Sequence, residues 1–277
     1  MAPLLNIVGA GHVGRTLGRL FHAHGVFTVQ DVLTRSQASA QDAVAFIGAG
    51  NALAQASALR PAQIWMLAVG DDQIAPACAA LAGSGLLAGA TVFHCSGAKA
   101  SSELQAASHA GARVASVHPV RSFADPAAVA AAFDGTWCGV EGDPAALAQL
   151  TAAFEVIGAR LVTIDAAAKT VYHAASVFAA NYLVTVLDAA LRAYAAAGVP
   201  PEVACELAQP LASETLANVF RLGAPAALSG PIARGDMATV ARQHAALHAW
   251  DAPTAHLYEA LATATGALAA RKRAGEA

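Results

Sequence analysis

A mostly apolar helical stretch carries polar side chains at helical spacing. Lys169, His173 and Ser176 are separated by four and three residues, which places them on one face of a helix. Polar groups among Ala and Val need partners or a wet cleft, and a buried lysine can have its pKa lowered enough to transfer protons near neutral pH. We predict that this face lines an active cleft, with Lys169 as the first candidate for proton transfer and His173 next. The alternative is a solvated helix end with buried hydrogen bonds.

Two further polar groups follow apolar runs that read as strands. His118, beside Pro119, ends one of these runs and is a candidate acid, base or donor near neutral pH; the alternative is a structural histidine fixed by a proline turn. Ser96 begins a small polar loop and could hold a substrate oxygen, or could cap the next helix. His244 and His248 have a zinc-like spacing but no third ligand nearby, so we expect no metal site.

The start of the chain shows what must position these groups. The apolar run Leu4–Val8 reads as a buried strand and flows into a glycine-rich turn and a helical segment. The turn consists of Gly9, Ala10, Gly11, His12, Val13 and Gly14. In this context the glycines permit a tight turn, close approach of a pyrophosphate and close helix–strand packing, and the helix N-terminus attracts the phosphates. A dinucleotide-binding site is predicted here, against the alternative of a plain glycine-rich turn.

The end of the second predicted strand indicates which dinucleotide binds. An acidic residue at this point would bind the ribose 2′-hydroxyl of NAD. Asp31 lies too early, and the strand ends in Thr34, Arg35 and Ser36. A guanidinium with neighbouring hydroxyls suits a 2′-phosphate, so we predict NADP (NADPH), with NAD less favoured. The alternative is that Arg35 is an ordinary surface residue in a turn.

A second cofactor-facing segment follows the predicted strand Ile64–Val69. Ala68, Val69 and Gly70 are small enough at this strand end for the backbone to lie close to a cofactor. The acidic residues that follow, Asp71 and Asp72, are expected to cap the next helix.

The pattern of elements predicts an α/β fold with two domains. Up to about residue 165, short apolar runs alternate with helical segments, which predicts a doubly wound, mainly parallel sheet of the Rossmann type. The other expected strands are Phe27–Leu33, Asn51–Leu53, Thr91–Cys95, Arg113–Val117, Trp137–Val140 and Arg160–Thr163. From 166 to 277 only helices are predicted, including one long helix over Ala166–Gly198 and a loop over Ser229–Asp236.

Composition excludes several classes of protein. The net charge of −3 and 13% charged residues argue against nucleic-acid binding. The longest apolar stretch, Ala166–Val199, contains several charged and polar residues and is not expected to span a membrane. We expect no signal peptide, because the first strand begins almost at once, and reduced thiols, because the four cysteines are scattered. A cytoplasmic protein is expected.

Several of these motifs together resemble one family. It pairs a Rossmann-like domain with a helical domain of unknown function, number 2520, and the resemblance covers almost the whole chain. The residues that carry it are Gly9–Gly14, Thr34–Ser36, Ala68–Asp71, His118-Pro119 with Ser122-Phe123, Lys169 with Tyr172-His173, and Gly230-Pro231 with Arg234-Gly235-Asp236.

The chain more widely resembles β-hydroxyacid dehydrogenases, pyrroline-5-carboxylate reductase and deazaflavin-dependent NADP reductases. This resemblance implies an NADP domain followed by a helical domain like the C-terminal domain of 6-phosphogluconate dehydrogenase, which commonly dimerises. Lys169 matches the acid/base lysine of the hydroxyacid dehydrogenases, but His173 stands where they have an asparagine, and Ala98 where their substrate loop has a glycine.

The resulting hypothesis is a homodimeric NADP-dependent oxidoreductase. It would transfer a hydride between the nicotinamide and a small carbonyl, hydroxyl or imine compound. The alternative is a catalytically silent NADP-binding sensor or scaffold, since a fold alone does not imply an activity. A third possibility is hydride exchange with a flavin or deazaflavin.

Overall fold

The computed structural model describes residues 1–275, so the end of the predicted second domain, 276–277, lies outside the described residues. Backbone contacts divide the chain into two compact units, Met1–Ala180 and Asn181–Ala277. The division falls later than the boundary predicted near residue 165, because the start of the long helix bonds to the first unit.

The first unit is built on one sheet of eight strands in the order β3-β2-β1-β4-β5-β6-β7-β8. All neighbouring strands are parallel except β6 and β7. The strands are β1 (Leu4–Val8), β2 (Thr28–Leu33), β3 (Asn51–Leu53), β4 (Ile64–Leu67), β5 (Thr91–His94), β6 (Arg113–Pro119), β7 (Trp137–Gly142) and β8 (Arg160–Thr163). The predicted fold class, a Rossmann-type sheet followed by helices, is confirmed.

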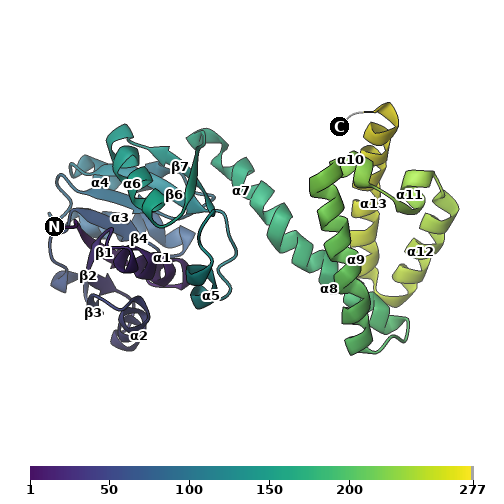
Figure 1. The fold of residues 1–277 in the computed structure, drawn as a ribbon, viewed down its shortest axis with the longest axis horizontal. Helices are drawn as coiled ribbons and strands as arrows, with labels where there is room; N and C mark the ends of the chain where they lie inside the picture. The colour runs from purple at the N-terminus through teal and green to yellow at the C-terminus, as the bar shows by residue number, and fades with distance from the viewer. Residues whose placement is uncertain (276–277) are drawn as a thin grey trace. The chain divides into compact units, whose positions relative to one another are not determined.

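Helices cover both faces of this sheet (Figure 1). They are α1 (His12–Ala23), α2 (Gln37–Ile47), α3 (Ile74–Ala82), α4 (Gln105–His109), α5 (Pro126–Ala131) and α6 (Pro144–Val156). After β8 the chain continues into α7 (Lys169–Val177). One apolar core lies under α1, α2, α5 and α6 and includes Phe21 and Phe154. The other lies under α3 and α4 and includes Trp65 and Leu104. Both faces of the central strands β1, β4 and β5 are therefore buried, which explains their continuous apolar sequences.

The chain reverses direction in the sheet between β1 and β4. It runs outward from β1 to β3 and then returns to place β4 on the other side of β1. The carboxyl ends of β1, β2, β4, β5 and β6 all lie along one edge, because these strands are parallel. Open sheets of this kind bind ligands at that edge, beside the reversal.

The second unit is helical. It contains α8 (Leu183–Ala196), α9 (Pro201–Leu222), α10 (Ala224–Ala227), α11 (Gly230–Arg234), α12 (Met237–Trp250) and α13 (Ala252–Ala274). The long helix predicted over Ala166–Gly198 is present as one helical segment, Ala166–Ala196, in which a turn of π-helix, Phe178–Tyr182, separates α7 from α8. One expectation needs correction. The predicted loop contains the short α11, which Pro231 starts and left-handed Gly235 ends.

One helical segment, Ala166–Ala196, is long and apolar enough to cross a membrane by length and composition alone. Its mean hydropathy is 1.5 and none of its most apolar window is buried. Lys169, near its start, is however fully buried against the sheet of the first unit. This end of the segment is therefore part of a folded domain.

Candidate active site

The glycine-rich turn lies at the carboxyl end of β1 and leads into α1. Gly9 has a left-handed φ of 83°, and a Cβ there would lie 2.7 Å from the carbonyl oxygen of Ala68. A Cβ on Gly14 would lie 2.6 Å from the carbonyl oxygen of Gly9 and 2.8 Å from the Cβ of Ala68. These two glycines, with Ala68 at the end of β4, let the turn, α1 and β4 pack together.

Gly11 differs from its neighbours because its surroundings are open. A Cβ on Gly11 would meet nothing within 4 Å. Gly11 is also the N-cap of α1, whose first turn has no acidic side chain. The N–H groups of the first turn of a helix have no partner within the helix and attract anions. The arrangement fits a dinucleotide pyrophosphate, as the sequence predicts.

His12, next to Gly11, contacts a loop that the sequence analysis did not link to this turn. Its Nδ1 lies 2.6 Å from the carbonyl oxygen of Phe123, and the Thr16 hydroxyl is 3.5 Å from the carbonyl of Pro126. The loop after β6 is thereby held beside the start of α1. Ser122 and Phe123 belong to a motif that the resemblance singled out, but only the fold shows what this segment contacts.

The segment after β2 presents one free cation. Arg35 is exposed, and no interaction with another described residue is found for its side chain. The Thr34 hydroxyl donates to the Ser36 carbonyl at 2.8 Å. The Ser36 hydroxyl caps α2 by accepting a hydrogen bond from the Ser39 N–H at 3.2 Å. Arg35 is thus free to bind a ligand, whereas Thr34 and Ser36 also shape the turn.

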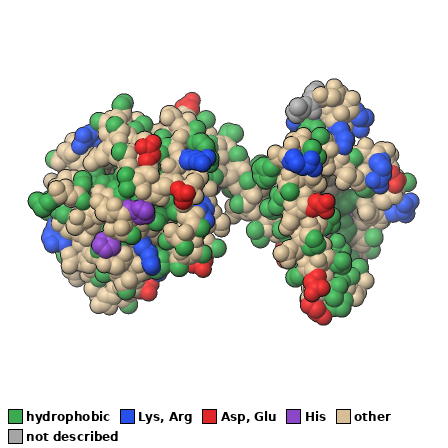
Figure 2. Space-filling view, viewed as in Figure 1, with side chains coloured by type: hydrophobic (Ala, Val, Ile, Leu, Met, Phe, Trp, Pro, Cys, Tyr) green, Lys and Arg blue, Asp and Glu red, His purple; other side chains and the backbone are tan. Residues whose placement is uncertain are grey.

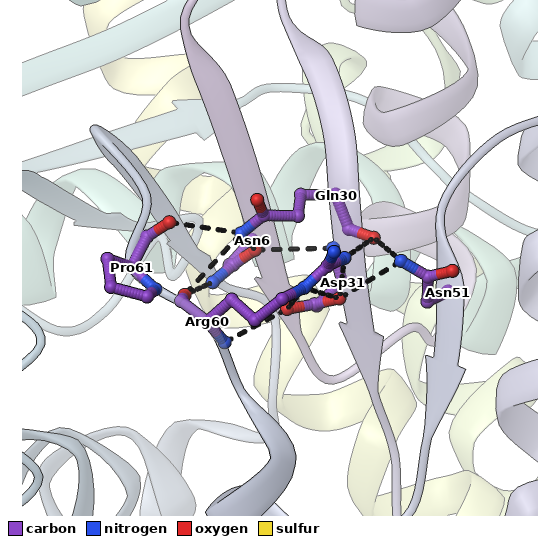
Figure 3. A network of polar contacts seen from close by, with 6 residues as sticks. All are labelled: Asn6, Gln30, Asp31, Asn51, Arg60 and Pro61. Atoms are coloured by element: carbon purple, nitrogen blue, oxygen red, sulfur yellow. Dashed lines mark hydrogen bonds and ion pairs between the residues drawn. The ribbon is translucent and has the colours of Figure 1, made fainter.

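Asp31 serves a structural purpose within β2, as Figure 3 shows. It is 1% exposed and accepts hydrogen bonds from Asn51 and from the backbone and guanidinium of Arg60, the shortest at 2.6 Å. Burial alone raises the pKa of Asp31, but the hydrogen bonds from Arg60 and Asn51 lower it below the ordinary value. The pairing of β1 with β2 is irregular at Asn6, and the Asn6 side chain there accepts a hydrogen bond from the Asp31 N–H at 3.2 Å. Asp31 therefore stabilises the sheet.

The segment after β4 continues the same edge. Ala68 and Val69 pack against Gly9, and Gly70 is open. The expected cap is absent: Gly70 and Gln73 occupy the cap positions of the next helical turns, and neither Asp71 nor Asp72 makes a capping hydrogen bond there. Both acidic residues lie instead within a turn of 3-10 helix, Asp71–Gln73, that directly precedes α3.

Lys169 is the centre of a buried polar cluster. It is 1% exposed, and its Nζ donates to the carbonyl of Ser96 at 3.0 Å and to the hydroxyl of Ser116. Its third neighbour is a carboxylate oxygen of Glu141 at 3.5 Å. Burial lowers the pKa of Lys169, and Glu141 partly offsets this effect. Because an ammonium has three N–H donors, all of them are directed at protein groups.

Glu141 is a site residue that sequence reasoning missed. It lies on β7, is 5% exposed, and accepts from the backbone N–H and hydroxyl of Ser101 at 2.8 and 2.7 Å. Lys169 and Glu141 thus join α7, β7 and the loop after β5. No spacing signal links them, because they meet only after β7 pairs with β6. A lone acidic residue in an apolar run was the one available signal.

His118 and Tyr172 form a second pair next to this cluster. Nδ1 of His118 lies 3.0 Å from the Tyr172 hydroxyl, and their rings meet edge to face. Burial lowers the pKa of His118 to about 4, as do the nearby His173 and Lys169. A Cβ on Gly139 would lie 2.4 Å from the Tyr172 hydroxyl, so only glycine fits beneath this ring.

Gly97 lets two imidazoles approach the loop after β5. A Cβ there would lie 2.4 Å from Cδ2 of His173 and 2.7 Å from Nε2 of His118. Ser96, by contrast, turns its hydroxyl inward and accepts from the N–H groups of Ala98 and Lys99 at 3.2 and 3.0 Å. The structure therefore brings together Lys169, His173, His118 and Ser96, and the roles given to them from the sequence stay predictions.

Two family profiles align with the chain. A Rossmann-like domain matches residues 4–119, and a domain of unknown function, DUF2520, matches residues 136–265. The chain is a Rossmann-like domain followed by a DUF2520 domain. Ser96 and His118 come from the Rossmann-like domain, while Glu141, Lys169 and Tyr172 come from the DUF2520 domain. The polar cluster therefore joins both domains within the first compact unit.

Solved structures share this architecture over nearly their whole length. Protein TM1727 from Thermotoga maritima is 26% identical, with 97% of this chain and 99% of that chain covered and a TM-score of 0.74. Protein BF3122 from Bacteroides fragilis is 19% identical, with 96% and 98% covered and a TM-score of 0.79. An imine reductase from Myxococcus stipitatus in complex with NADP⁺ is 17% identical, with 99% and 96% covered and a TM-score of 0.67. No functionally curated protein aligns with this chain.

The DUF2520 domain has a pocket of its own in the helical unit. It has a volume of about 520 Å³ and is lined by Arg234 and Arg273 together with small and apolar residues. Asp236, in the same motif as Arg234, caps α12 by accepting from the Thr239 N–H at 3.0 Å.

The two histidines with zinc-like spacing lie on α12. Nε2 of His244 lies 4.0 Å from a carboxylate oxygen of Glu259, and the ring centroids of His244 and His248 are 6.3 Å apart.

Proposed function

We propose that this protein is an NADP-dependent oxidoreductase acting on a small carbonyl, hydroxyl or imine compound. The observation that carries the proposal is the order of groups along one edge of the sheet. Arg35 follows β2, the open Gly11 follows β1, the small residues Ala68–Gly70 follow β4, and the His118 cluster follows β5 and β6. An extended dinucleotide has its phosphates, sugars and reactive ring in a matching linear order.

The chemistry of each position supports this assignment. The N-terminus of α1 would hold the pyrophosphate, and the Arg35 guanidinium would bind a 2′-phosphate. Asp31 cannot bind a ribose in its place, because Arg60 and Asn51 occupy its oxygens. When bound, the cofactor supplies or accepts a hydride. The imine reductase with the same fold is bound to NADP⁺, which supports the choice of cofactor.

A turnover assay tests the proposal. Wild-type protein is mixed with NADPH and, separately, with pyruvate, glyoxylate, succinic semialdehyde or 2-methyl-1-pyrroline, and loss of NADPH absorbance is followed. We expect saturable oxidation with at least one of these probes, and much slower oxidation when NADH replaces NADPH. Tight NADPH binding without turnover of any probe would instead support a sensor or scaffold. A visible flavin or deazaflavin in the purified protein would point to exchange between two cofactors.

A further inference from the structure

The geometry around His118 favours one position for its proton. Nδ1 of His118 lies 3.0 Å from the Tyr172 hydroxyl, and burial raises the pKa of Tyr172, so the phenol keeps its proton and has one to donate. We take the hydroxyl as the donor and Nδ1 as the acceptor. An imidazole that accepts at Nδ1 and is neutral carries its proton on Nε2.

The remaining nitrogen faces the loop after β5. A Cβ on Gly97 would come within 2.7 Å of Nε2 of His118, and the described part of the chain offers this nitrogen no hydrogen bond. His118 is half-buried. An N–H donor at the carboxyl edge of the sheet is thus left without a protein acceptor, which contrasts with the fully engaged Lys169.

We propose that His118 and Tyr172 form a proton relay, in which Nε2 of His118 contacts the substrate oxygen and Tyr172 supplies the proton. The relay rests on the proposed function. Lys169 is then a positioning residue, because its contacts to Ser96, Ser116 and Glu141 fix the loop and strand that hold His118.

In the reduction of a carbonyl, the relay can deliver the proton without forming a charged imidazole. A bound nicotinamide would supply the hydride to the carbonyl carbon, and the electrons of the C=O π bond would then move to the oxygen. The oxygen takes the Nε2 proton, Nδ1 takes the hydroxyl proton of Tyr172, and the histidine stays neutral throughout. Tyr172 is left as a phenolate, and the site is restored when water protonates Nε2 and Nδ1 returns its proton to the phenolate. In alcohol oxidation the same proton transfers run in reverse.

The charged groups around His118 agree with a neutral relay. His173 and Lys169 approach from α7 and Asp71 approaches from the segment after β4. With burial as the largest cause, the pKa of His118 is lowered to about 4 although Asp71 acts in the opposite direction. A neutral imidazole of this kind is a poor acid by itself, so it needs the phenol behind it.

The tautomer of His118 is the first test, and it needs neither cofactor nor substrate. Long-range proton–nitrogen NMR of the full-length protein at pH 7 should show a neutral His118 with its proton on Nε2. In Tyr172→Phe this preference should weaken and the pKa of His118 should rise, because the donor to Nδ1 is lost. An imidazolium, or a proton on Nδ1 in the wild type, contradicts the relay.

Turnover is the second test, with the carbonyl probes named above and NADPH. Tyr172→Phe should lower kcat about a hundredfold, within the range typical of general acid catalysis, with an unchanged Kd for NADPH. Tyr194→Phe in α8, the same chemical change in the helical unit, serves as the control. If Tyr172→Phe keeps the kcat of the wild type, the relay is wrong but the proposed function stands. A wild type that binds NADPH but turns over no probe overturns the proposed function and the relay with it.

Discussion

Arg35 is the residue on which the cofactor preference depends most directly. It is the exposed cation at the end of β2 and has no partner among the described residues. In Arg35→Ala the affinity for NADPH should fall by roughly ten- to a hundredfold, since a hydrogen bond to a charged group contributes about 1.5–3 kcal/mol. Affinity for NADH should not change. Fluorescence titrations of both cofactors measure this, and Arg242→Ala on α12 is the control. An unchanged NADPH preference contradicts the role of Arg35.

Gly11 and Gly14 provide a matched pair of substitutions three residues apart. Gly11→Ala should cost less than about 1 kcal/mol of stability, because its Cβ enters open space, but should weaken NADPH binding strongly. Gly14→Ala places a Cβ 2.6 Å from the Gly9 carbonyl oxygen and should destabilise the fold by about 1–3 kcal/mol. Urea unfolding and NADPH titration separate the two effects. Equal behaviour of the two variants would mean that the space beside Gly11 is not a ligand site.

At the scale of elements, Glu141 and Lys169 join β7 to α7. Glu141→Gln removes the counter-charge of a buried ammonium and should cost about 3–5 kcal/mol at pH 7. Burial lowers the pKa of Lys169 in the folded state below its ordinary value of 10.5. At a pH between the folded-state pKa and 10.5, the unfolded state therefore binds more protons than the folded state, and the free energy of unfolding rises with pH. The deficit of Glu141→Gln should therefore shrink as the pH approaches 10.5.

The control for this substitution is Glu103→Gln, which breaks the surface pair between Lys99 and Glu103 at 3.4 Å. It should cost less than about 1 kcal/mol at any pH. Urea unfolding of both variants from pH 7 upward gives the comparison. A deficit in Glu141→Gln that is small, or that does not depend on pH, would show that the buried pair does not tie these elements together.

The elements themselves could largely be predicted from the sequence. Strands such as Leu4–Val8 and Thr91–His94 are found where the apolar runs predict them, because a strand buried on both faces has a strong local signal. The π-helical turn at Phe178–Tyr182 and the short α11 were not predicted. Both elements are only five residues long, which is too short to change the spacing of apolar residues in the sequence.

The candidate site was predictable only in part. Lys169, His173, His118 and Ser96 were singled out by residue type and position after strands or on one helix face. Glu141 was not singled out, and the contact between His118 and Tyr172 was not predicted. Both depend on the antiparallel pairing of β6 with β7. That register places His118 opposite Gly139 and Ser116 opposite Glu141, a relation between distant segments.

At the scale of the whole molecule, large apolar side chains remain on the surface of the helical unit (Figure 2). Val184, Leu211 and Phe220 are 68%, 60% and 87% exposed. These side chains are candidates for the interface of the homodimer that the sequence resemblance implies. Light scattering should then give twice the mass of the 27.7 kDa chain, and Phe220→Glu should shift the protein toward monomer.

A monomeric wild type in light scattering would contradict this pairing. Binding of the wild-type protein to lipid vesicles of phosphatidylcholine and phosphatidylglycerol would contradict it too. Tyr194→Phe, which keeps the apolar surface, is the control for the change at Phe220. The side chains named above belong to the helical unit, whereas the residues proposed to bind the dinucleotide belong to the first unit. NADPH binding by Phe220→Glu should therefore equal that of the wild type.

The central claim is that a dinucleotide lies along the carboxyl edge of the sheet. Hydrogen–deuterium exchange of the full-length protein, with and without NADPH, tests it most directly. Protection should appear in the peptides that contain Gly9–Gly14, Thr34–Ser36, Ala68–Gly70 and Gly97, and not in Asn51–Leu53 or the residues around Arg60, which belong to the structural network of Asp31. NADPH that protects none of the first group, or only peptides of the helical unit, would contradict the account.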